Sequence, residues 1–104
     1  MSDKYELTQE TIDFNGIILH RIRALKDFGS VKAGSLGGFI ESEKNLSQEG
    51  TCWINDYAKV FDNARVSDNA QVSELARVYD NARINGLAWV SDNARTSGND
   101  WIFS

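Results

Sequence analysis

A strict six-residue period runs through the second half of this 104-residue chain and limits what the chain can fold into. In each period an alanine is followed, two positions later, by a β-branched residue. The alanines are Ala58, Ala64, Ala70, Ala76, Ala82, Ala88 and Ala94, and the β-branched residues are Val60, Val66, Val72, Val78, Ile84, Val90 and Thr96. Neither a helix nor a single strand has this period. It indicates a solenoid, in which short repeats stack because none can bury a core alone.

The other positions of the repeat have a chemistry that suits one short strand and one corner. The β-branched residue fits an extended backbone and points inward, so its two neighbours point outward. The Asp-Asn pair that follows, as in Asp62 and Asn63, tolerates left-handed backbone angles and can turn the chain without glycine.

The consensus Val/Ile-x-Asp/Gly-Asn-Ala-Arg, clearest in residues 60–65, 66–71, 78–83 and 90–95, resembles the bacterial hexapeptide-repeat family. That resemblance covers residues 54–103 well and 36–53 loosely. It implies a left-handed parallel β-helix in which three hexapeptides make one triangular coil of 18 residues. In such a coil residues 18 apart stack, so Asn63, Asn81 and Asn99 are expected to form a corner ladder whose amides bond along the column. We therefore predict an all-β fold that is a left-handed parallel β-helix with an N-terminal β-hairpin cap.

The front of the chain lacks the period. Asn15-Gly16 is a strong hairpin signal, and residues 11–14 and 17–23 are expected to pair as strands in a cap of residues 1–35. The β-helix is predicted over residues 36–104, with a degenerate first coil at 36–53 and regular coils at 54–104. Counting back by sixes places four residues of the first coil in inward phase: Leu36, Ile40, Leu46 and Cys52.

Composition and charge exclude several classes. The net charge is −4, shared equally by the two halves, so no basic tail for nucleic acid is present. No apolar run approaches the roughly 20 residues that span a bilayer, and the N-terminus does not resemble a signal peptide. A single cysteine, Cys52, excludes an internal disulfide and suits a reducing compartment. We predict a cytoplasmic protein of the bacterial cell that binds neither membrane nor nucleic acid.

Outward positions of the predicted coils carry several aromatic residues, which is unusual unless something covers them. These candidate interface residues are Trp53, Phe61, Tyr79, Trp89, Trp101 and Phe103. Interface cores favour aromatic side chains and arginine, so we expect contacts with another protein or a second copy. The chain stops midway through a coil, and we expect a homodimer or higher oligomer to cover that end.

Candidate catalytic and ligand sites are weak by comparison. Acyltransferases with this repeat resemble one another in using a histidine within or beside the coils. The coils of this chain contain no histidine. His20, in the front segment, is expected to be an ordinary strand residue. Cys52 falls in an alanine phase, which favours a buried thiol over a nucleophile. The outward column of Lys59, Arg77 and Arg95 could attract an acidic ligand or be solvated, and we favour solvation. We predict no catalytic, metal or cofactor site, and no cofactor.

A second resemblance concerns the front segment. Residues 5–8, 22–29, 37–41 and 45–47 are similar to the opening of phage and prophage hexapeptide-repeat proteins that are often described as transferases or polymer-forming proteins. This implies a phage context without catalytic residues to carry over. We predict a non-enzymatic interaction protein that acts by protein–protein binding, inhibiting or modulating a bacterial host or defence protein. An acyltransferase-like enzyme and a structural virion component are the alternatives.

Overall fold

The protein is described by a computed structural model covering residues 3–102. Three longer strands come first, β1 (Tyr5–Phe14), β2 (Ile17–Ala24) and β3 (Leu36–Ile40), followed by a short 3-10 helix η1 (Glu43–Asn45). Nine two-residue strands follow: β4 (Trp53–Ile54), β5 (Lys59–Val60), β6 (Arg65–Val66), β7 (Gln71–Val72), β8 (Arg77–Val78), β9 (Arg83–Ile84), β10 (Trp89–Val90), β11 (Arg95–Thr96) and β12 (Trp101–Ile102).

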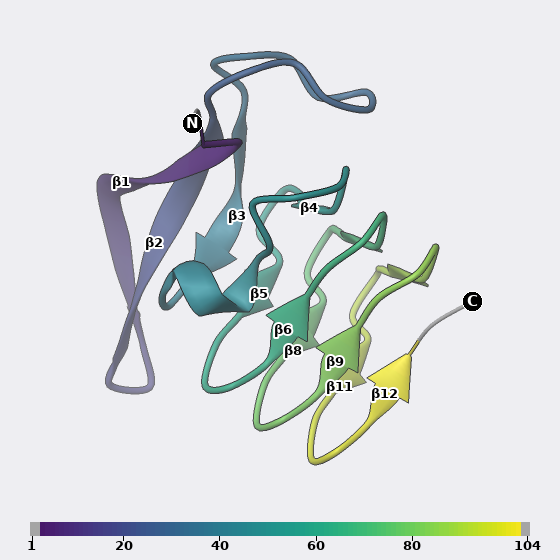
Figure 1. The fold of residues 1–104 in the computed structure, drawn as a ribbon. Helices are drawn as coiled ribbons and strands as arrows, with labels where there is room; N and C mark the ends of the chain where they lie inside the picture. Colours follow the sequence, from purple (N-terminus) through teal and green to yellow (C-terminus); the bar gives the residue numbers. More distant parts are fainter. Residues whose placement is uncertain (1–2, 103–104) are drawn as a thin grey trace.

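The short strands form the three faces of a β-solenoid (Figure 1). We name these face A (β5, β8, β11), face B (β4, β7, β10) and face C (β6, β9, β12). Strands within each face pair in parallel with an 18-residue offset, as in Val60 with Val78 and Val78 with Thr96. The predicted parallel β-helix of 18-residue coils is therefore confirmed, and its handedness stays an implication of the family resemblance.

The interior is filled by the two periodic residue types. The columns of β-branched residues are closed to solvent, with Val60, Val72 and Ile84 each 0% exposed. Alanines such as Ala64 and Ala70 are equally buried just past the corners, where a larger side chain would not fit. Each buried aliphatic side chain contributes about 1.5–3 kcal/mol. The coils are thus held by a solid core.

Most solenoid corners are turned by an aspartate in the left-handed region, and the others by Glu74, Gly86 or Gly98, rather than by asparagine. Asp62 and Asp80 have φ near 58° and 59°, and Gly98 takes this place one coil later. The Asp62 carboxylate accepts the Asp80 backbone N–H at 3.2 Å, and Asp80 accepts the Gly98 N–H at 3.1 Å. Within residues 3–102 no hydrogen bond joins the predicted ladder of Asn63, Asn81 and Asn99 amides. Among the described residues the bond to the next coil is instead made by the carboxylate one position earlier, so hydrogen bonds along the predicted ladder are not formed.

The first coil is two residues longer than the rest, which overturns part of the predicted phase. Ile40 pairs with Val60 and Leu46 with Val66, offsets of 20 residues, while Ile54 returns to 18 with Val72. Ile40 and Leu46 are buried, but they occupy the column of branched residues and not that of the alanines. Leu36 was predicted to point inward, yet it is 53% exposed because it belongs to a strand that continues the hairpin.

The extra residues lie in the corner of Gln48, Glu49 and Gly50. The flanking residues Ser47 and Thr51 resume solenoid hydrogen bonds, donating to the Val66 and Asp68 carbonyls. Gly50 has φ +73°, and a Cβ there would lie 2.2 Å from the Asp68 carbonyl oxygen. Only glycine therefore fits the widened corner.

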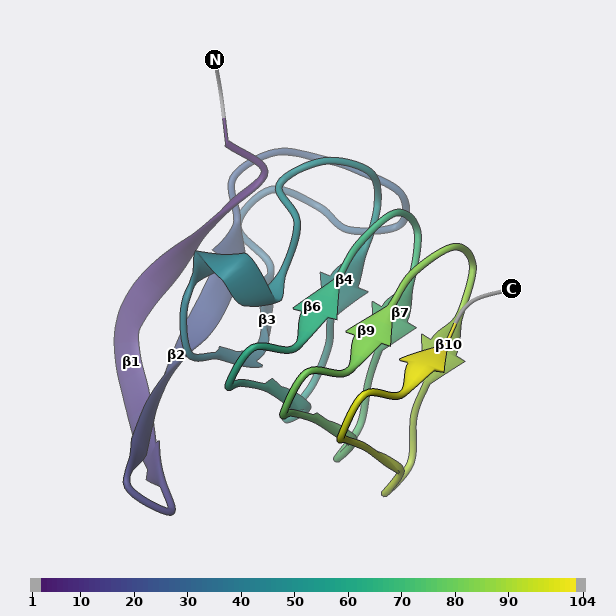
Figure 2. The same ribbon diagram turned by 60° about the horizontal axis from the view of Figure 1, so that its bottom comes forward.

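The N-terminal hairpin extends face A. Strands β1 and β2 pair antiparallel around the predicted Asn15-Gly16 turn, β2 pairs with β3, and β3 pairs in parallel with β5. Both hairpin strands are longer than the sequence predicted. The twisted hairpin lies beside the first coils in both views (Figures 1 and 2). The cap can therefore shield outward positions of the solenoid.

Candidate functional site

Two of the predicted interface residues lie beneath the cap. Trp53 is only 1% exposed because the rings of Tyr5 and Phe28 pack edge-on against it, at centroid distances of 6.3 and 5.2 Å. Phe61 is buried between Phe14 of the hairpin tip at 5.5 Å and Tyr79 at 5.3 Å. Tyr79 is half-buried in the same cluster. The cap covers these rings within one chain.

The other aromatic positions are open. Trp89 on face B is 72% exposed, and its indole N–H donates to the Ser73 hydroxyl at 3.4 Å. Trp101 on face C is 60% exposed, with the Arg83 guanidinium 6.0 Å from its ring. Phe103 lies outside the described residues. Of the predicted interface residues that the structure describes, those most open to a partner therefore lie on the C-terminal coils.

Exposed aliphatic residues flank Trp89. Leu87, 69% exposed, lies at the corner before β10, and Leu75 lies exposed at the corner after β7. The outward strand positions of face B are Trp53, Gln71 and Trp89, which carry no charge. The outward strand positions of face B are therefore uncharged, and of its two tryptophans only Trp89 is exposed.

Faces A and C are basic by contrast. Lys59, Arg77 and Arg95 lie directly opposite one another along face A. Arg65 and Arg83 do the same on face C. The three faces thus differ in charge although the same six-residue repeat builds them.

A buried lysine links the cap to the widened corner, and the periodic pattern gave no signal for it. Lys4 is 1% exposed, and its Nζ donates to the carbonyls of Cys52 at 2.8 Å, Glu49 at 3.3 Å and Gly50 at 3.5 Å. The Gln48 amide oxygen accepts the backbone N–H of Lys4 at 2.8 Å. Burial lowers the pKa of the Lys4 ammonium. Lys4 therefore satisfies carbonyls that the irregular corner leaves without strand partners.

Cys52 and His20 show no catalytic arrangement. Cys52 is buried, and burial raises the pKa of its thiol although the nearby Lys4 charge opposes the shift. A thiol of this kind is a poor nucleophile. The His20 Nδ1 lies 3.2 Å from the Thr8 carbonyl in its own hairpin. Among residues 3–102, no three His, Cys, Asp or Glu side chains are grouped as ligands for a metal.

The described part of the chain also holds no helix long and apolar enough to cross a membrane. Its helical residues form the short turn η1 alone.

Comparisons with known proteins agree with the solenoid. The family description "YdcK Beta solenoid repeat" matches residues 58–74 and 76–92. A protein of Escherichia coli strain K12, named "Uncharacterized acetyltransferase YdcK", is 40% identical over 73 residues. The match covers 62% of this chain and 22% of that protein, so this chain spans less than a quarter of its relative. The repeat chemistry, the 18-residue coils and these similarities agree that the chain forms a β-solenoid of six-residue repeats, similar to that of the YdcK repeat family.

Proposed function

We propose that the chain is a non-enzymatic interaction protein that acts by protein–protein binding, with face B as its docking surface. The observation that carries this is Trp89, which is 72% exposed on a rigid parallel sheet between the exposed leucines Leu75 and Leu87. Tryptophan is enriched among the residues that dominate binding energy, and a preformed flat sheet loses little entropy on docking.

The charge pattern favours a second copy of this chain as the occupant. Two copies meeting through face A or face C would bring columns of like charge together, which costs free energy in an interface. The outward strand positions of face B are uncharged, and the nearest carboxylates, such as Asp56 and Glu74, lie at its corner. A twofold contact that places Trp89 of each copy near the centre is therefore the arrangement that supports this proposal best.

The test measures molar mass by light scattering over a concentration series of the full chain. We expect a dimer, and we expect the double variant Trp89→Ala and Leu87→Ser to weaken dimerisation by at least about 30-fold, as loss of a residue contributing about 2 kcal/mol implies. The matched control Ile18→Ser removes an exposed apolar side chain from the hairpin and should dimerise normally. A monomer at all concentrations, or equal effects of both variants, would overturn the choice of face B.

The front-segment resemblance supports a finer version of the proposal, in which a phage-encoded dimer inhibits or modulates a bacterial host or defence protein. Affinity capture from host lysate tests it by comparing the intact chain with a variant that alters an exposed arginine column, such as Arg65→Glu together with Arg83→Glu on face C. A host protein held by the intact chain and lost by this variant supports the finer version. Equal capture by both counts against it.

An acetyltransferase-like activity is the second candidate, because the relative with 40% identity is named an acetyltransferase. Titration of the full chain with acetyl-CoA in a calorimeter separates the two candidates. Saturable binding that is reduced by His20→Ala would favour the enzyme. An interaction protein is expected to give no saturable heat.

A further inference from the structure

A cleft of about 280 Å³ separates the hairpin tip from face A. Phe14, Asn15 and Ile17 line it from the hairpin, and Phe61, Tyr79, Arg77 and Arg95 line it from the solenoid. It lies away from face B, and the interaction proposed above does not use it.

One wall of the cleft carries a stack of two aromatic rings that ends at Tyr79. The rings of Phe61 and Tyr79 are stacked with centroids 5.3 Å apart and planes 7° apart, since the two residues occupy one column 18 positions apart. The next residue in that column is Ser97, whose small side chain supplies no ring. A planar group bound beside Tyr79 would therefore extend the stack by one ring.

Beside this stack, on the same solenoid wall, lies a column of three cations, of which Arg77 and Arg95 line the cleft. Lys59, Arg77 and Arg95 are register neighbours on strands that lie about 4.8 Å apart. Like charges directly opposite one another on neighbouring strands are destabilising. The Phe14 ring offsets part of this, because the Arg77 guanidinium lies 4.7 Å and the Lys59 ammonium 5.5 Å from its centroid.

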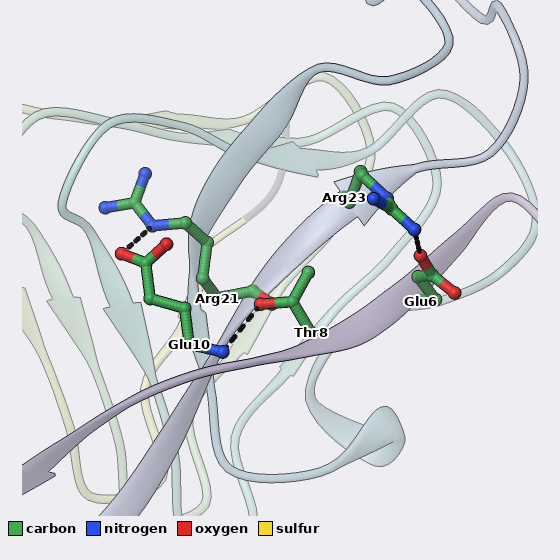
Figure 3. A network of polar contacts seen from close by, with 5 residues as sticks. All are labelled: Glu6, Thr8, Glu10, Arg21 and Arg23. Atoms are coloured by element: carbon green, nitrogen blue, oxygen red, sulfur yellow. Dashed lines mark hydrogen bonds and ion pairs between the residues drawn. The ribbon is translucent and has the colours of Figure 1, made fainter.

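Acidic side chains do not neutralise this column. Both ion pairs of residues 3–102 lie on the hairpin, Arg21 with Glu10 and Arg23 with Glu6 (Figure 3). No carboxylate of the described residues comes within 4.0 Å of Arg77 or Arg95.

The carboxylates next in sequence to the lining residues Phe14 and Tyr79 are otherwise engaged. Asp13 accepts the Gly16 backbone N–H at 2.8 Å, and Asp80 accepts that of Gly98 at 3.1 Å. Two guanidinium groups are therefore left to recognise an external anion.

From the aromatic stack and the adjacent cations we propose that the cleft binds a small planar aromatic anion, with its ring against Tyr79 and its acidic group between Arg77 and Arg95. The guanidinium fork matches the oxygen pairs of carboxylates and phosphates, and both sources of charge fit this chemistry. Arg77 is half-buried beneath Phe14 and so is not freely solvated as the sequence predicted, whereas Arg95 is exposed.

The experiment is a calorimetric titration of the full chain with phenyl phosphate, benzoate, phenol and inorganic phosphate. We expect phenyl phosphate or benzoate to bind at one site with a Kd of about 1 mM or tighter. Phenol and inorganic phosphate, which each lack one half of the recognised chemistry, should bind at least tenfold more weakly. The stronger of the two aromatic anions identifies phosphate or carboxylate as the preferred charge.

Variants locate the site. Arg95→Gln and Tyr79→Ser should each weaken binding of the preferred anion at least tenfold, and circular dichroism should show both variants folded. Arg65→Gln, at the equivalent strand position on face C, is the matched control and should bind like the parent chain. Arg95 is exposed and makes no ion pair within the described residues, so its loss leaves the fold intact.

Three results would overturn the proposal. One is the absence of saturation at concentrations well above the expected Kd. The second is inorganic phosphate binding as tightly as phenyl phosphate, which would mean that the ring is not recognised. The third is equal weakening by Arg95→Gln and Arg65→Gln, which would show a general charge effect.

Discussion

Replacing Gly50 by alanine tests whether the widened first corner is held by close backbone packing. Gly50 has φ +73°, and alanine in this region costs about 1–2 kcal/mol. The added Cβ would also lie 2.2 Å from the Asp68 carbonyl oxygen, a backbone atom of the next coil that cannot move alone. Forcing the coils apart adds about 1–3 kcal/mol. We expect Gly50→Ala to lower the free energy of unfolding by about 2–5 kcal/mol.

Gly34→Ala is the matched control for this prediction. Gly34 also has positive φ, +89°, and lies in the cap loop at the same end of the molecule, but nothing lies within 4 Å of its added Cβ. It should lose only the conformational part, about 1–2 kcal/mol. Urea unfolding followed by circular dichroism measures both variants. Losses that agree within about 0.5 kcal/mol would show that the coils yield easily at this corner and would refute the packing argument.

Two further predictions concern the aspartate hydrogen bonds between successive corners and the packing of the cap. Asp62→Ala should lower the free energy of unfolding, measured in urea, by about 1.5–3 kcal/mol, because it loses the hydrogen bond from the Asp80 N–H and places alanine at φ 58°. Asp62→Gly should lose only the hydrogen bond, about 1 kcal/mol. Equal losses in the two variants would contradict this division between backbone conformation and hydrogen bond. Burial raises the pKa of the Tyr5 hydroxyl above its ordinary value near 10, and this hydroxyl donates to the Leu46 carbonyl at 2.5 Å. The folded state therefore keeps a proton that the unfolded state releases, so the contribution of Tyr5 to stability is complete below pH 10 and declines above it. Tyr5→Phe should make the alkaline fall in thermal stability shallower than in the parent chain, and an unchanged slope would argue against this origin.

The periodic residues predicted the solenoid because their chemistry is local. Val60, Asp62 and Ala64 each need only their own strand, corner or interior site, and the same need recurs every six residues. The counting failed at Leu36 and in the phase of Ile40 and Leu46, where Gln48, Glu49 and Gly50 enlarge one corner. The six-residue period does not show where extra residues interrupt it. The interruption is seen only in the 20-residue offset between the paired strands.

The candidate site was predictable in part. Period and alternation placed Trp53, Phe61, Tyr79 and Trp89 on outward positions, and the strand register agrees with that placement. Which of these rings meet solvent depends on Tyr5, Phe14 and Phe28, which come from a non-repeating segment and contact the coils across large sequence separations. Lys4 escaped prediction for the same reason, since its partners are carbonyls of the irregular corner.

The sequence by itself thus determined the repeat and the side of the wall on which each periodic residue lies, because these follow from short-range backbone preferences repeated many times, while the 18-residue coil was implied by the family resemblance. The tertiary structure alone decided which face remains open and where charge stays without a partner. Those properties arise when the hairpin folds back over face A and the first coil, leaving Trp89 exposed and Arg77 beneath Phe14. Long-range packing of that kind has no period from which it could be predicted.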